Sequence, residues 1–582
     1  MSNNKKPKSS SFRNVVKVRL IFVSGLLLLF AVALIARLAN LQIAQHKTLL
    51  AKSEKQPHHG NLKTYLGRGT IFDRNGNELA TNLMVESVFV VPQEVRDRKY
   101  TSKVLASALG QNYDRVYKEV SSNKQFAWIK RKASTDEIIH LKKAALSGVR
   151  FRSEQKRFYP KRELAANVIG FVGTDDYGLA GIEQTYQGKL KGMVYSQPIE
   201  QDGRGRNIQN LGSLSRSNLG NYDLMLTLDE VIQFTAEYHL TKQVERYKAD
   251  SGMAVVMNPN SGEIYAMANV PQFNPNNYNK FTPETRKNNT VVSSYEPGSI
   301  FKPIVAAAAL DNGIAQPHDK FFCENGSFKI GGKNIGEASN HKYGSLSVQE
   351  IIAKSSNIGA IKIAQKLGKD SFYEYIRKFG FGEKTNIRLP GVSSGLLGKR
   401  KNWNERSLAS ISFGQEIAVT PLQMVVALSA IANGGTLMEP HIAKALMRDG
   451  KIIKEIKPKK IRRVISEKTS RQMMEILKFV VENGTGKKAA IDGFEVAGKT
   501  GTAQKYIAET QSYSKTEFIS SFIGYAPADN PRLAILVMID NPKGRHWGGV
   551  VAAPVFVKIV EKSLRHLNVT SRKERIFILD RA

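Results

Sequence analysis

One uncharged apolar run near the N-terminus constrains this chain most, because it decides on which side of a membrane the remainder folds. The run extends from Leu20 to Ala36 between Arg19 and Arg37, and residues 38–43 can lengthen it. About 20 apolar residues in a helix cross a bilayer. We therefore predict a transmembrane anchor at residues 20–43.

The tail before this anchor, residues 1–19, is rich in basic side chains: Lys5, Lys6, Lys8, Arg13, Lys17 and Arg19. Positive charge stays on the cytoplasmic side of a membrane span. The tail is thus predicted to be cytoplasmic, and residues 44 onward to lie outside the inner (cytoplasmic) membrane on one span. A cleaved signal peptide is the alternative. Ala31 and Ala33 lie inside the run rather than after it, and its apolar core exceeds about 7–15 residues, so a retained anchor is favoured.

The formal net charge of +35 indicates an anionic partner. No paired zinc ligands and no aromatic-basic RNA-binding signature occur, so nucleic acid is not the predicted partner. Anionic lipid head groups and pyrophosphate-bearing substrates suit the charge better. Cys323 is the only cysteine, which excludes an intrachain disulfide and predicts a buried spectator thiol.

Residues 44–221 are predicted to form a non-catalytic, mixed α/β pedestal. Gly67–Asn82 (GRGTIFDRNGNELATN) is typical of two strands joined by a turn at Asn75-Gly76. Thr135–Leu146 has helical spacing, and Gly203–Gly205 is predicted to be a turn. The region has no phosphate loop and no His, Cys, Asp and Glu cluster at metal-ligand spacing, so neither a cofactor nor a metal is predicted.

Residues 222–570 are predicted to form the catalytic domain, followed by a tail at 571–582. Two early hairpin strands and three late strands flank a helical middle: Met253–Asn258, Glu263–Val270, Glu495–Gln504, Phe518–Tyr525 and Leu533–Ile539. A strand at Asp223–Asp229 and a helix at Glu230–Lys248 precede them. This order predicts an α+β fold in which the late strands join the hairpin in one antiparallel sheet.

The first candidate catalytic motif is Ser299-Ile300-Phe301-Lys302. Pro303 is tolerated only near a helix start, so it places a helix N-terminus close to Ser299. Unpaired backbone N–H groups there can stabilise developing negative charge. Lys302 lies on the same helical face three residues on, where a lysine of lowered pKa can act as the base for the serine hydroxyl.

Two further motifs follow, Ser355-Ser356-Asn357 and Lys499-Thr500-Gly501-Thr502. Helical periodicity alone runs one helix from Ser347 to Leu367 through the second motif, with a capping box at Ser347 and Glu350. The third motif lies in a predicted strand, where glycine often marks the close approach of a ligand or another backbone. Each motif alone has an ordinary structural explanation: chance, an exposed helix face, or a turn.

Together, in this order, the three motifs resemble the signature set of penicillin-binding proteins and serine β-lactamases. Spacings of 56 and 144 residues between Ser299, Ser355 and Lys499 suit an all-helical insert followed by the far edge of a sheet. The chain resembles class B penicillin-binding proteins along nearly its whole length. The resemblance extends to Gly67–Asn82, Arg157-Phe-Tyr-Pro160, Gly178-Leu-Ala-Gly-Ile-Glu183 and Ala552-Ala-Pro-Val-Phe556.

Within that class the chain resembles the division-septum enzyme. Tyr295-Glu296-Pro297-Gly298 and Lys354-Ser355-Ser356-Asn357 resemble the septal type, whereas elongation-type relatives tend to have a second proline where Glu296 stands. The family often has Asn-Arg at Asn288-Asn289 and a second glycine at Glu416. Both departures lie outside the three motifs, so they affect substrate detail rather than the chemistry.

The resemblance implies a penicillin-binding transpeptidase domain and a two-stage acyl transfer. Ser299 would attack the bond between two terminal D-alanines of a peptidoglycan stem peptide, and an amine of a neighbouring strand would take the acyl group. Lys302 would be the base, with Ser355 and Lys499 relaying the proton. The predicted substrate-binding residues are Asn357 for the substrate amide, Thr500 and Thr502 for the terminal carboxylate, Gly501 between them, and the N–H groups of Ser299 and Thr502 for the oxyanion.

The same resemblance implies partners. β-Lactams would acylate Ser299, and the lipid-linked precursor would be the substrate. No segment resembles a glycosyltransferase domain, so a polytopic membrane glycosyltransferase and other divisome proteins are expected to act with the chain.

Four other functions remain as alternatives. An elongation-type transpeptidase differs mainly in its partners, and a serine β-lactamase would need a deacylating glutamate. A β-lactam sensor would need signalling machinery inside the cell, where only residues 1–19 are predicted to lie. A non-enzymatic divisome scaffold would tolerate replacement of Ser299 by alanine.

Overall fold

The computed structural model describes residues 10–55, 59–65, 67–192, 194–201, 207–208, 221–507 and 510–571. The chain divides into two compact units, residues 1–66 with 194–218 and residues 67–193 with 219–582. The cytoplasmic-tail prediction for residues 1–9, the turn at Gly203–Gly205 and most of the C-terminal tail lie outside the described ranges.

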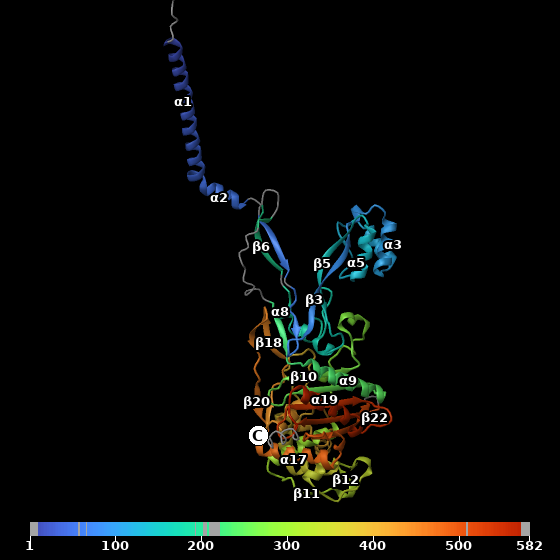
Figure 1. Ribbon diagram of the computed structural model, residues 1–582. Helices are drawn as coiled ribbons and strands as arrows, with labels where there is room; N and C mark the ends of the chain where they lie inside the picture. Colours follow the sequence, from blue (N-terminus) through green and yellow to red (C-terminus); the bar gives the residue numbers. More distant parts are fainter. Residues whose placement is uncertain are drawn as a thin grey trace, which may run out of the picture. The chain divides into compact units, whose positions relative to one another are not determined.

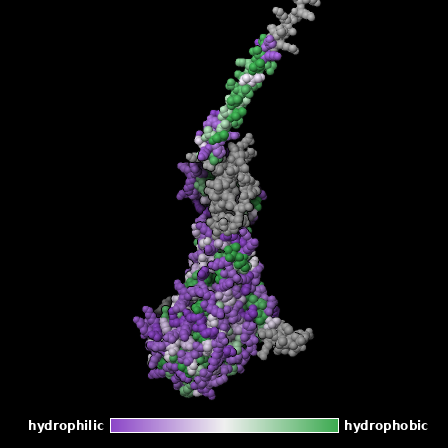
Figure 2. Space-filling model, turned by 90° about the vertical axis from the view of Figure 1, so that its left-hand side faces the viewer, coloured by the Kyte–Doolittle hydropathy of each residue, from purple (hydrophilic) through white to green (hydrophobic). Residues whose placement is uncertain are grey.

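The first unit contains the N-terminal helix. α1 (Ser10–Ala39) runs through a π-helical turn, η1 (Asn40–Ala44), towards α2 (His46–Lys55). The segment Asn14–Ala44 is long and apolar enough to cross a membrane, and none of it is buried; Figure 2 shows its apolar surface. The predicted anchor lies within this segment. The unit also contains an antiparallel sheet of β1 (His59–Tyr65), β6 (Val194–Gln201) and β7 (Asn207–Ile208).

In the second unit, residues 67–192 are built around β3 (Glu78–Val90). It pairs antiparallel with β2 (Ile71–Phe72), β4 (Ala127–Lys130) and β5 (Val149–Phe158). The predicted turn between the first two strands is confirmed, because the Asp73 carboxylate accepts hydrogen bonds from the N–H groups of Asn75 and Asn77, both at 2.8 Å. This local closure explains why the hairpin could be identified from sequence.

Short helices complete the pedestal. They are α3 (Arg98–Leu109), α4 (Tyr113–Val120), α5 (Thr135–Ala144), α6 (Ala166–Ile169), α7 (Gly181–Thr185) and α8 (Gln187–Leu190), with η2 (Pro92–Glu94). α5 confirms the predicted helix, and Ser134 with Glu137 forms its capping box. A small core that includes Val88, Leu105 and Ile138 joins α3–α5 to the strands, which appear together in Figure 1.

The pedestal sheet continues across the predicted domain boundary at residues 221–222. β8 (Asp223–Leu226) pairs in parallel with β2 and antiparallel with β18 (Ala443–Arg448), which pairs with β19 (Lys451–Glu455). Three strands that follow the predicted boundary, β8, β18 and β19, thus extend the pedestal sheet. The boundary itself stays a prediction.

The centre of the catalytic part is a five-stranded antiparallel sheet. Its order is β10 (Ile264–Val270), β9 (Ser251–Met257), β23 (Leu533–Asp540), β22 (Ser512–Ala526) and β21 (Ala497–Ile507). The predicted union of the late strands with the early hairpin is therefore confirmed. Both faces are buried, since Val255 and Leu536 belong to one core while Val256 and Val537 belong to the other.

α9 (Glu230–Arg246) and α19 (Ala553–His566) contribute to the second core with α18 (Gly548–Val551). The first core contains α11 (Lys302–Asp311), α12 (Val348–Lys354), α13 (Asn357–Leu367), α14 (Lys369–Lys378), α15 (Glu405–Ser412), α16 (Pro421–Ala432) and α17 (Glu467–Asn483), with α10 (Asn289–Val292). Cys323 is buried, as predicted, and burial raises the pKa of its thiol.

The expected all-helical insert between Ser299 and Lys499 is wrong in detail. Small antiparallel pairs interrupt the helices: β11 (Lys320–Phe322) with β14 (Ser345–Ser347), β12 (Ser327–Ile330) with β13 (Lys333–Gly336), β15 (Leu396–Leu397) with β16 (Ile417–Ala418), and β17 (Thr436–Met438) with β20 (Lys460–Arg463). Each strand has two to four residues, which is too short for an alternating pattern to emerge from sequence.

Candidate active site

The first motif lies where a 3₁₀ turn runs into a helix. Ser299 belongs to η5 (Gly298–Phe301), and Lys302 is the first residue of α11, with Pro303 in its first turn. The predicted helix start is therefore confirmed, with the serine one turn ahead of the α-helix. Ser299 is half-buried and Lys302 is fully buried. In the described structure no hydrogen bond joins their side chains.

The second motif breaks the helix that periodicity predicted. α12 ends at Lys354 and α13 begins at Asn357, so the single helix from Ser347 to Leu367 is wrong. Ser355 has φ of +59°, a left-handed conformation that strains a non-glycine residue. The Ser356 side chain then caps α13 by accepting a hydrogen bond from Gly359 N–H at 2.9 Å. The capping box at Ser347 and Glu350 is confirmed.

This break turns Ser355 towards the two lysines of the other motifs. Lys302 Nζ donates to the Ser355 carbonyl oxygen at 2.6 Å and to Asn357 Oδ1 at 2.8 Å. Lys499 Nζ donates to Ser355 Oγ at 2.9 Å. Lys302 Nζ also donates to Ser355 Oγ at 3.4 Å, so residues from segments 53 and 144 positions away from Ser355 form one hydrogen-bonded chain, from Lys302 through Ser355 to Lys499.

Burial lowers the pKa of both lysines in this hydrogen-bonded chain. It lowers the pKa of Lys302 to about 7, although the Glu337 carboxylate opposes the shift. Burial lowers the pKa of Lys499 well below its ordinary value, and the positive charge of Lys302 adds to that effect. Two buried amines that share Ser355 repel each other when both are protonated. A neutral lysine amine, which a base must be, is therefore accessible near neutral pH.

The third motif lies on β21, at the edge of the sheet. Lys499 also donates to the Thr500 carbonyl oxygen at 3.0 Å, and the hydroxyls of Thr500 and Thr485 are 2.7 Å apart. Thr502 Oγ1 accepts a hydrogen bond from Gly548 N–H at 3.1 Å. Gly501 packs so closely that an added Cβ would lie 2.3 Å from Ser521 Oγ and 2.8 Å from Ile300 Cγ2. The glycine therefore lets β21 approach the turn that carries Ser299.

Replacing Gly501 by alanine should separate β21 from η5. A displacement of about 1 Å can cost on the order of a hundredfold in rate, so we expect G501A to lower the second-order rate constant of penicillin acylation at least about tenfold. Stopped-flow fluorescence measures this constant. Gly188→Ala is the matched control, because no described atom lies within 4 Å of its added Cβ. Equal rates in the two variants would contradict the steric argument.

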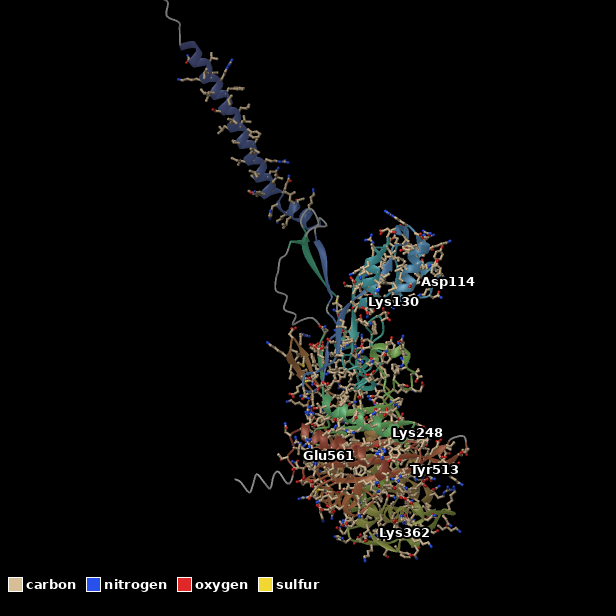
Figure 3. All side chains as sticks on the ribbon, turned by 45° about the vertical axis from the view of Figure 1, so that its right-hand side comes forward. Asp114, Lys130, Lys248, Lys362, Tyr513 and Glu561 are labelled. Carbon is tan, nitrogen blue, oxygen red and sulfur yellow. The ribbon has the colours of Figure 1, made fainter. Side chains whose placement is uncertain are left out.

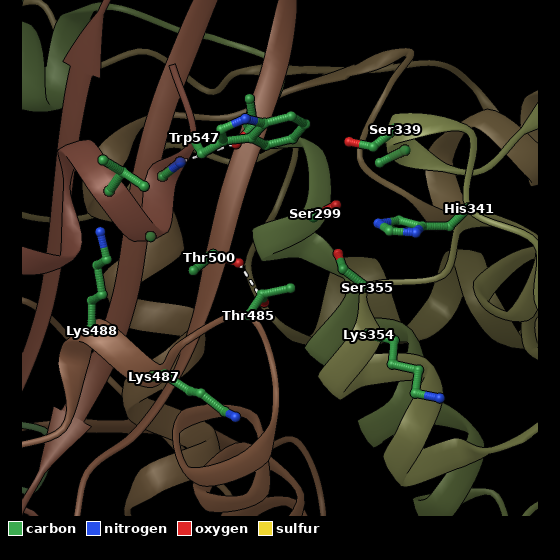
Figure 4. Close-up of a pocket in the computed structure, with 15 residues that line it drawn as sticks. Ser299, Ser339, His341, Lys354, Ser355, Thr485, Lys487, Lys488, Thr500 and Trp547 are labelled. Atoms are coloured by element: carbon green, nitrogen blue, oxygen red, sulfur yellow. Dashed lines mark hydrogen bonds between the residues drawn. The ribbon is translucent and has the colours of Figure 1, made fainter. Parts of the chain in front are cut away.

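A cavity of about 440 Å³ opens beside these residues. Ser299, Ser355, Thr500 and Thr502 line it, with Trp547 at one end. Figure 4 shows the Ser299 and Ser355 side chains on one side and the Thr485–Thr500 hydroxyl pair facing them. The site contains amines, hydroxyls and backbone N–H groups. In the described ranges no group of three or more His, Cys, Asp or Glu could hold a metal ion.

Sequence reasoning missed two supporting residues. Buried Glu337 accepts hydrogen bonds from Ser356 Oγ and from Asn357 N–H, so it fixes the second motif. Thr485 holds Thr500, and its N–H donates to the Ala353 carbonyl oxygen at 3.1 Å. The Gly484-Thr485-Gly486 turn was a weak signal for Thr485. Glu337 had none, since its partners come from folding rather than from spacing.

The structure shows the surroundings of the two departures from the family pattern, at Glu416 and at Asn288-Asn289. Glu416 has φ of +57°, which explains why glycine suits this position. Its N–H donates to Glu296 Oε1 at 2.9 Å, and Tyr513 (labelled in Figure 3) donates to the same oxygen at 3.1 Å. Glu296 therefore joins the segment before Ser299 to two other elements. Asn288 caps α10 and accepts a hydrogen bond from Asn269 Nδ2 at 3.1 Å.

Comparison with known families matches most of the chain. Residues 252–561 match the penicillin binding protein transpeptidase domain, and residues 63–226 match the penicillin-binding protein dimerisation domain. Stage V sporulation protein D of Bacillus subtilis is 37% identical over 96% of this chain and 88% of its own length. Peptidoglycan D,D-transpeptidase FtsI of Escherichia coli is 32% identical over 98% of this chain and 95% of its own.

Solved structures agree with this grouping. Penicillin binding protein 3 from Mycobacterium tuberculosis, in complex with aztreonam, has a TM-score of 0.66 and 28% identity, covering 88% of this chain and 98% of that one. A peptidoglycan synthetase from Bifidobacterium adolescentis has a TM-score of 0.69 and 26% identity over 88% and 97% of the two chains.

Proposed function

This chain belongs to the class B penicillin-binding proteins and is a peptidoglycan D,D-transpeptidase, and from that premise we propose that it cross-links septal peptidoglycan during cell division through an acyl-Ser299 intermediate. The catalytic part of this proposal rests on the hydrogen-bonded chain in which Ser355 Oγ accepts from Lys302 Nζ at 3.4 Å and from Lys499 Nζ at 2.9 Å. It places two buried amines of lowered pKa, one from the first motif and one from the third, beside Ser355 of the second motif.

In the proposed first stage, Ser299 Oγ attacks the carbonyl carbon between the two terminal D-alanines. Lys302 takes the hydroxyl proton, and Ser355 with Lys499 passes a proton to the departing amine. The N–H groups of Ser299 and Thr502 stabilise the oxyanion. Asn357 holds the substrate amide, and Thr500 and Thr502 hold the terminal carboxylate on either side of Gly501. β-Lactams acylate Ser299 by the same attack.

The pH dependence tests the role of Lys302. A base works only when it is deprotonated, and the pKa of Lys302 is lowered to about 7. We therefore expect the acylation rate constant to fall about tenfold per pH unit below 7 and to level off above it. Measuring penicillin acylation from pH 5 to 9 checks this. A flat profile across that range would contradict the assignment of Lys302 as the base.

The septal role is supported by Glu296 and by the segment Lys354–Asn357, which resemble the division type. The Glu296 carboxylate accepts hydrogen bonds from Glu416 N–H and from the Tyr513 hydroxyl, and a proline at this position could accept neither. An elongation role and a role in sporulation, after the name of the Bacillus relative, are the alternatives. Depletion in growing cells separates them: long undivided filaments support the septal role, whereas rounded cells or a defect confined to sporulation overturn it.

The single-pass topology completes the proposal. The basic residues before the apolar helix support a cytoplasmic N-terminus, with residues 44 onward in the periplasm or outside the cell. The lipid-linked precursor, a polytopic glycosyltransferase and other divisome proteins are the proposed partners at the membrane.

One time course separates the enzyme from its rivals. The full chain in detergent is incubated with fluorescent penicillin, and the adduct is followed after a chase with unlabelled drug. A label that persists for many minutes and disappears in Ser299→Ala supports the transpeptidase. Rapid turnover overturns it in favour of a β-lactamase, and absent labelling in the unaltered chain favours a scaffold.

A further inference from the structure

The far end of the active-site cavity carries a cluster of cationic side chains. Lys487 and Lys488 from η9 (Lys487–Ala489) and Lys354 from the last turn of α12 line it, and all three are exposed. In Figure 4 they flank the Thr485–Thr500 pair, with Lys354 on the opposite side from Lys488. Among the residues that the structure describes, no aspartate or glutamate lines this cavity. We call these three lysines the cationic rim.

The rim is distinct from the general basic surface of the chain. Other lysines nearby are neutralised: Lys478 pairs with Glu495 at 3.0 Å, and Lys362 pairs with Glu324 at 2.8 Å. Over the residues that the structure describes, none of the three rim lysines takes part in an ion pair. Lys354 lies over the ring of Tyr343, 5.5 Å from its centroid, and its charge helps to lower the pKa of Glu350 one helical turn before it, so Lys487 and Lys488 are the two rim lysines that no described carboxylate offsets.

The loop that carries Lys487 and Lys488 is held in place. Its backbone is tied to α12 by Thr485 N–H and to α17 by Gly486 N–H, which donates to the Val480 carbonyl oxygen at 3.1 Å. The Thr485 hydroxyl is tied to Thr500 on β21. A Cβ on Gly484 would lie 2.5 Å from the Ala353 carbonyl oxygen, so the loop packs directly against the segment before Ser355. Folding thus fixes these cations relative to the catalytic motifs.

We infer that the cationic rim selects the acyl acceptor, favouring an amine that stands beside a carboxylate over an amine without one. The inference rests on the proposed function. There, Thr500 and Thr502 hold the terminal carboxylate of the donor, and the rim lies beyond Thr500 on that side. An acceptor must replace the departing D-alanine at the same carbonyl carbon, so it occupies this end of the cavity.

Charge explains the selectivity. A simple alkylammonium ion is repelled by three cations, whereas an ammonium beside a carboxylate is attracted through its anionic group. The rim also favours the neutral amine over the ammonium, because like charges lower an amine pKa. That neutral nitrogen attacks the acyl carbon, forming the C–N bond while the C–Oγ ester bond breaks. One amine proton passes through the Ser355–lysine chain to Ser299 Oγ, which restores the serine.

A competition between two acceptors tests the inference. The full chain is acylated with a benzoyl-D-alanyl thioester in the presence of equal concentrations of D-alanine and D-alaninamide, which differ only in the carboxylate. The product ratio reports the preference within one preparation. In the unaltered chain we expect D-alanine to be favoured, and in K487Q/K488Q we expect that preference to fall about five- to tenfold, as for the loss of two exposed charges.

The matched control is K451Q/K454Q, which removes two exposed lysines on β19, outside the cavity, and should keep the ratio of the unaltered chain. Raising salt from 0.05 to 0.5 M should weaken the preference of the unaltered chain. An unchanged ratio in K487Q/K488Q, or transfer to neither acceptor, overturns the inference. Penicillin labelling tests the proposed function separately. If the protein is labelled by penicillin but shows no preference between D-alanine and D-alaninamide, acceptor selection by the rim is refuted and the transpeptidase function stands.

Discussion

Methionine in place of Lys302 should lower the rate constant of penicillin acylation by at least about a thousandfold. A positioned general base contributes about 10²–10⁴ in rate, and Lys302 also fixes Ser355 and Asn357 through its two short hydrogen bonds. Methionine has a similar length and suits a fully buried position, so the fold should remain intact. Rapid-quench labelling with fluorescent penicillin gives the rate, and a thermal unfolding scan reports the fold.

Two further variants sharpen this result. Arginine at position 302 keeps the charge but cannot become neutral, so it should be as inactive as methionine if deprotonation is required. Lys362→Met on α13 (labelled in Figure 3) removes a surface lysine that pairs with Glu324 and should acylate normally. If K302M acylates within about tenfold of the unaltered chain, another group is the base, and the chain through Ser355 serves only to hold the motifs together.

The parts of the fold predictable from sequence are those fixed by local interactions. The hairpin at residues 67–82, the helix caps at Ser134 and Ser347, and the central strands all have their determinants within a few residues. The union of the late strands with the early hairpin in one antiparallel sheet was also predicted, whereas the order of the strands within that sheet depends on long-range pairing and was not. The three motifs identified the site because the residue types and their order carried the information.

What sequence could not give depends on distant contacts. The periodicity of residues 347–367 continues through Ser355, and the helix breaks there because Lys302 and Lys499 hold Ser355 from segments that lie 53 and 144 residues away. Glu337 is invisible for the same reason, since its partners Ser356 and Asn357 are close only in the folded chain. Strained backbone conformations held by long-range contacts are concentrated at catalytic sites. Prediction from local sequence patterns is therefore least accurate at the active site.

In the pedestal, three of the segments that resemble the family, at residues 67–82, 157–160 and 178–183, meet at one buried ion-pair cluster. Glu183 on α7 is fully buried and pairs with Arg68 at 2.5 Å and with Arg157 on β5 at 2.6 Å. Tyr159 donates to the same carboxylate at 3.3 Å. The tight turn before α7 requires Gly178, because a Cβ there would lie 2.0 Å from the Glu183 carbonyl oxygen. The three segments therefore meet in the fold because one buried carboxylate pairs with two buried guanidinium groups.

Glutamine at position 183 should accordingly destabilise the pedestal by about 3–5 kcal/mol, the usual effect of removing one partner from a buried ion pair. The amide keeps the size of the side chain, so the loss reports charge rather than packing. Thermal unfolding and limited proteolysis of the full chain measure it. Glu94→Gln is the matched control, because Glu94 and Arg150 form an exposed pair worth less than about 1 kcal/mol. If E183Q and E94Q unfold alike, the buried cluster is held by its hydrogen bonds and packing, and the negative charge of Glu183 is not what joins these segments.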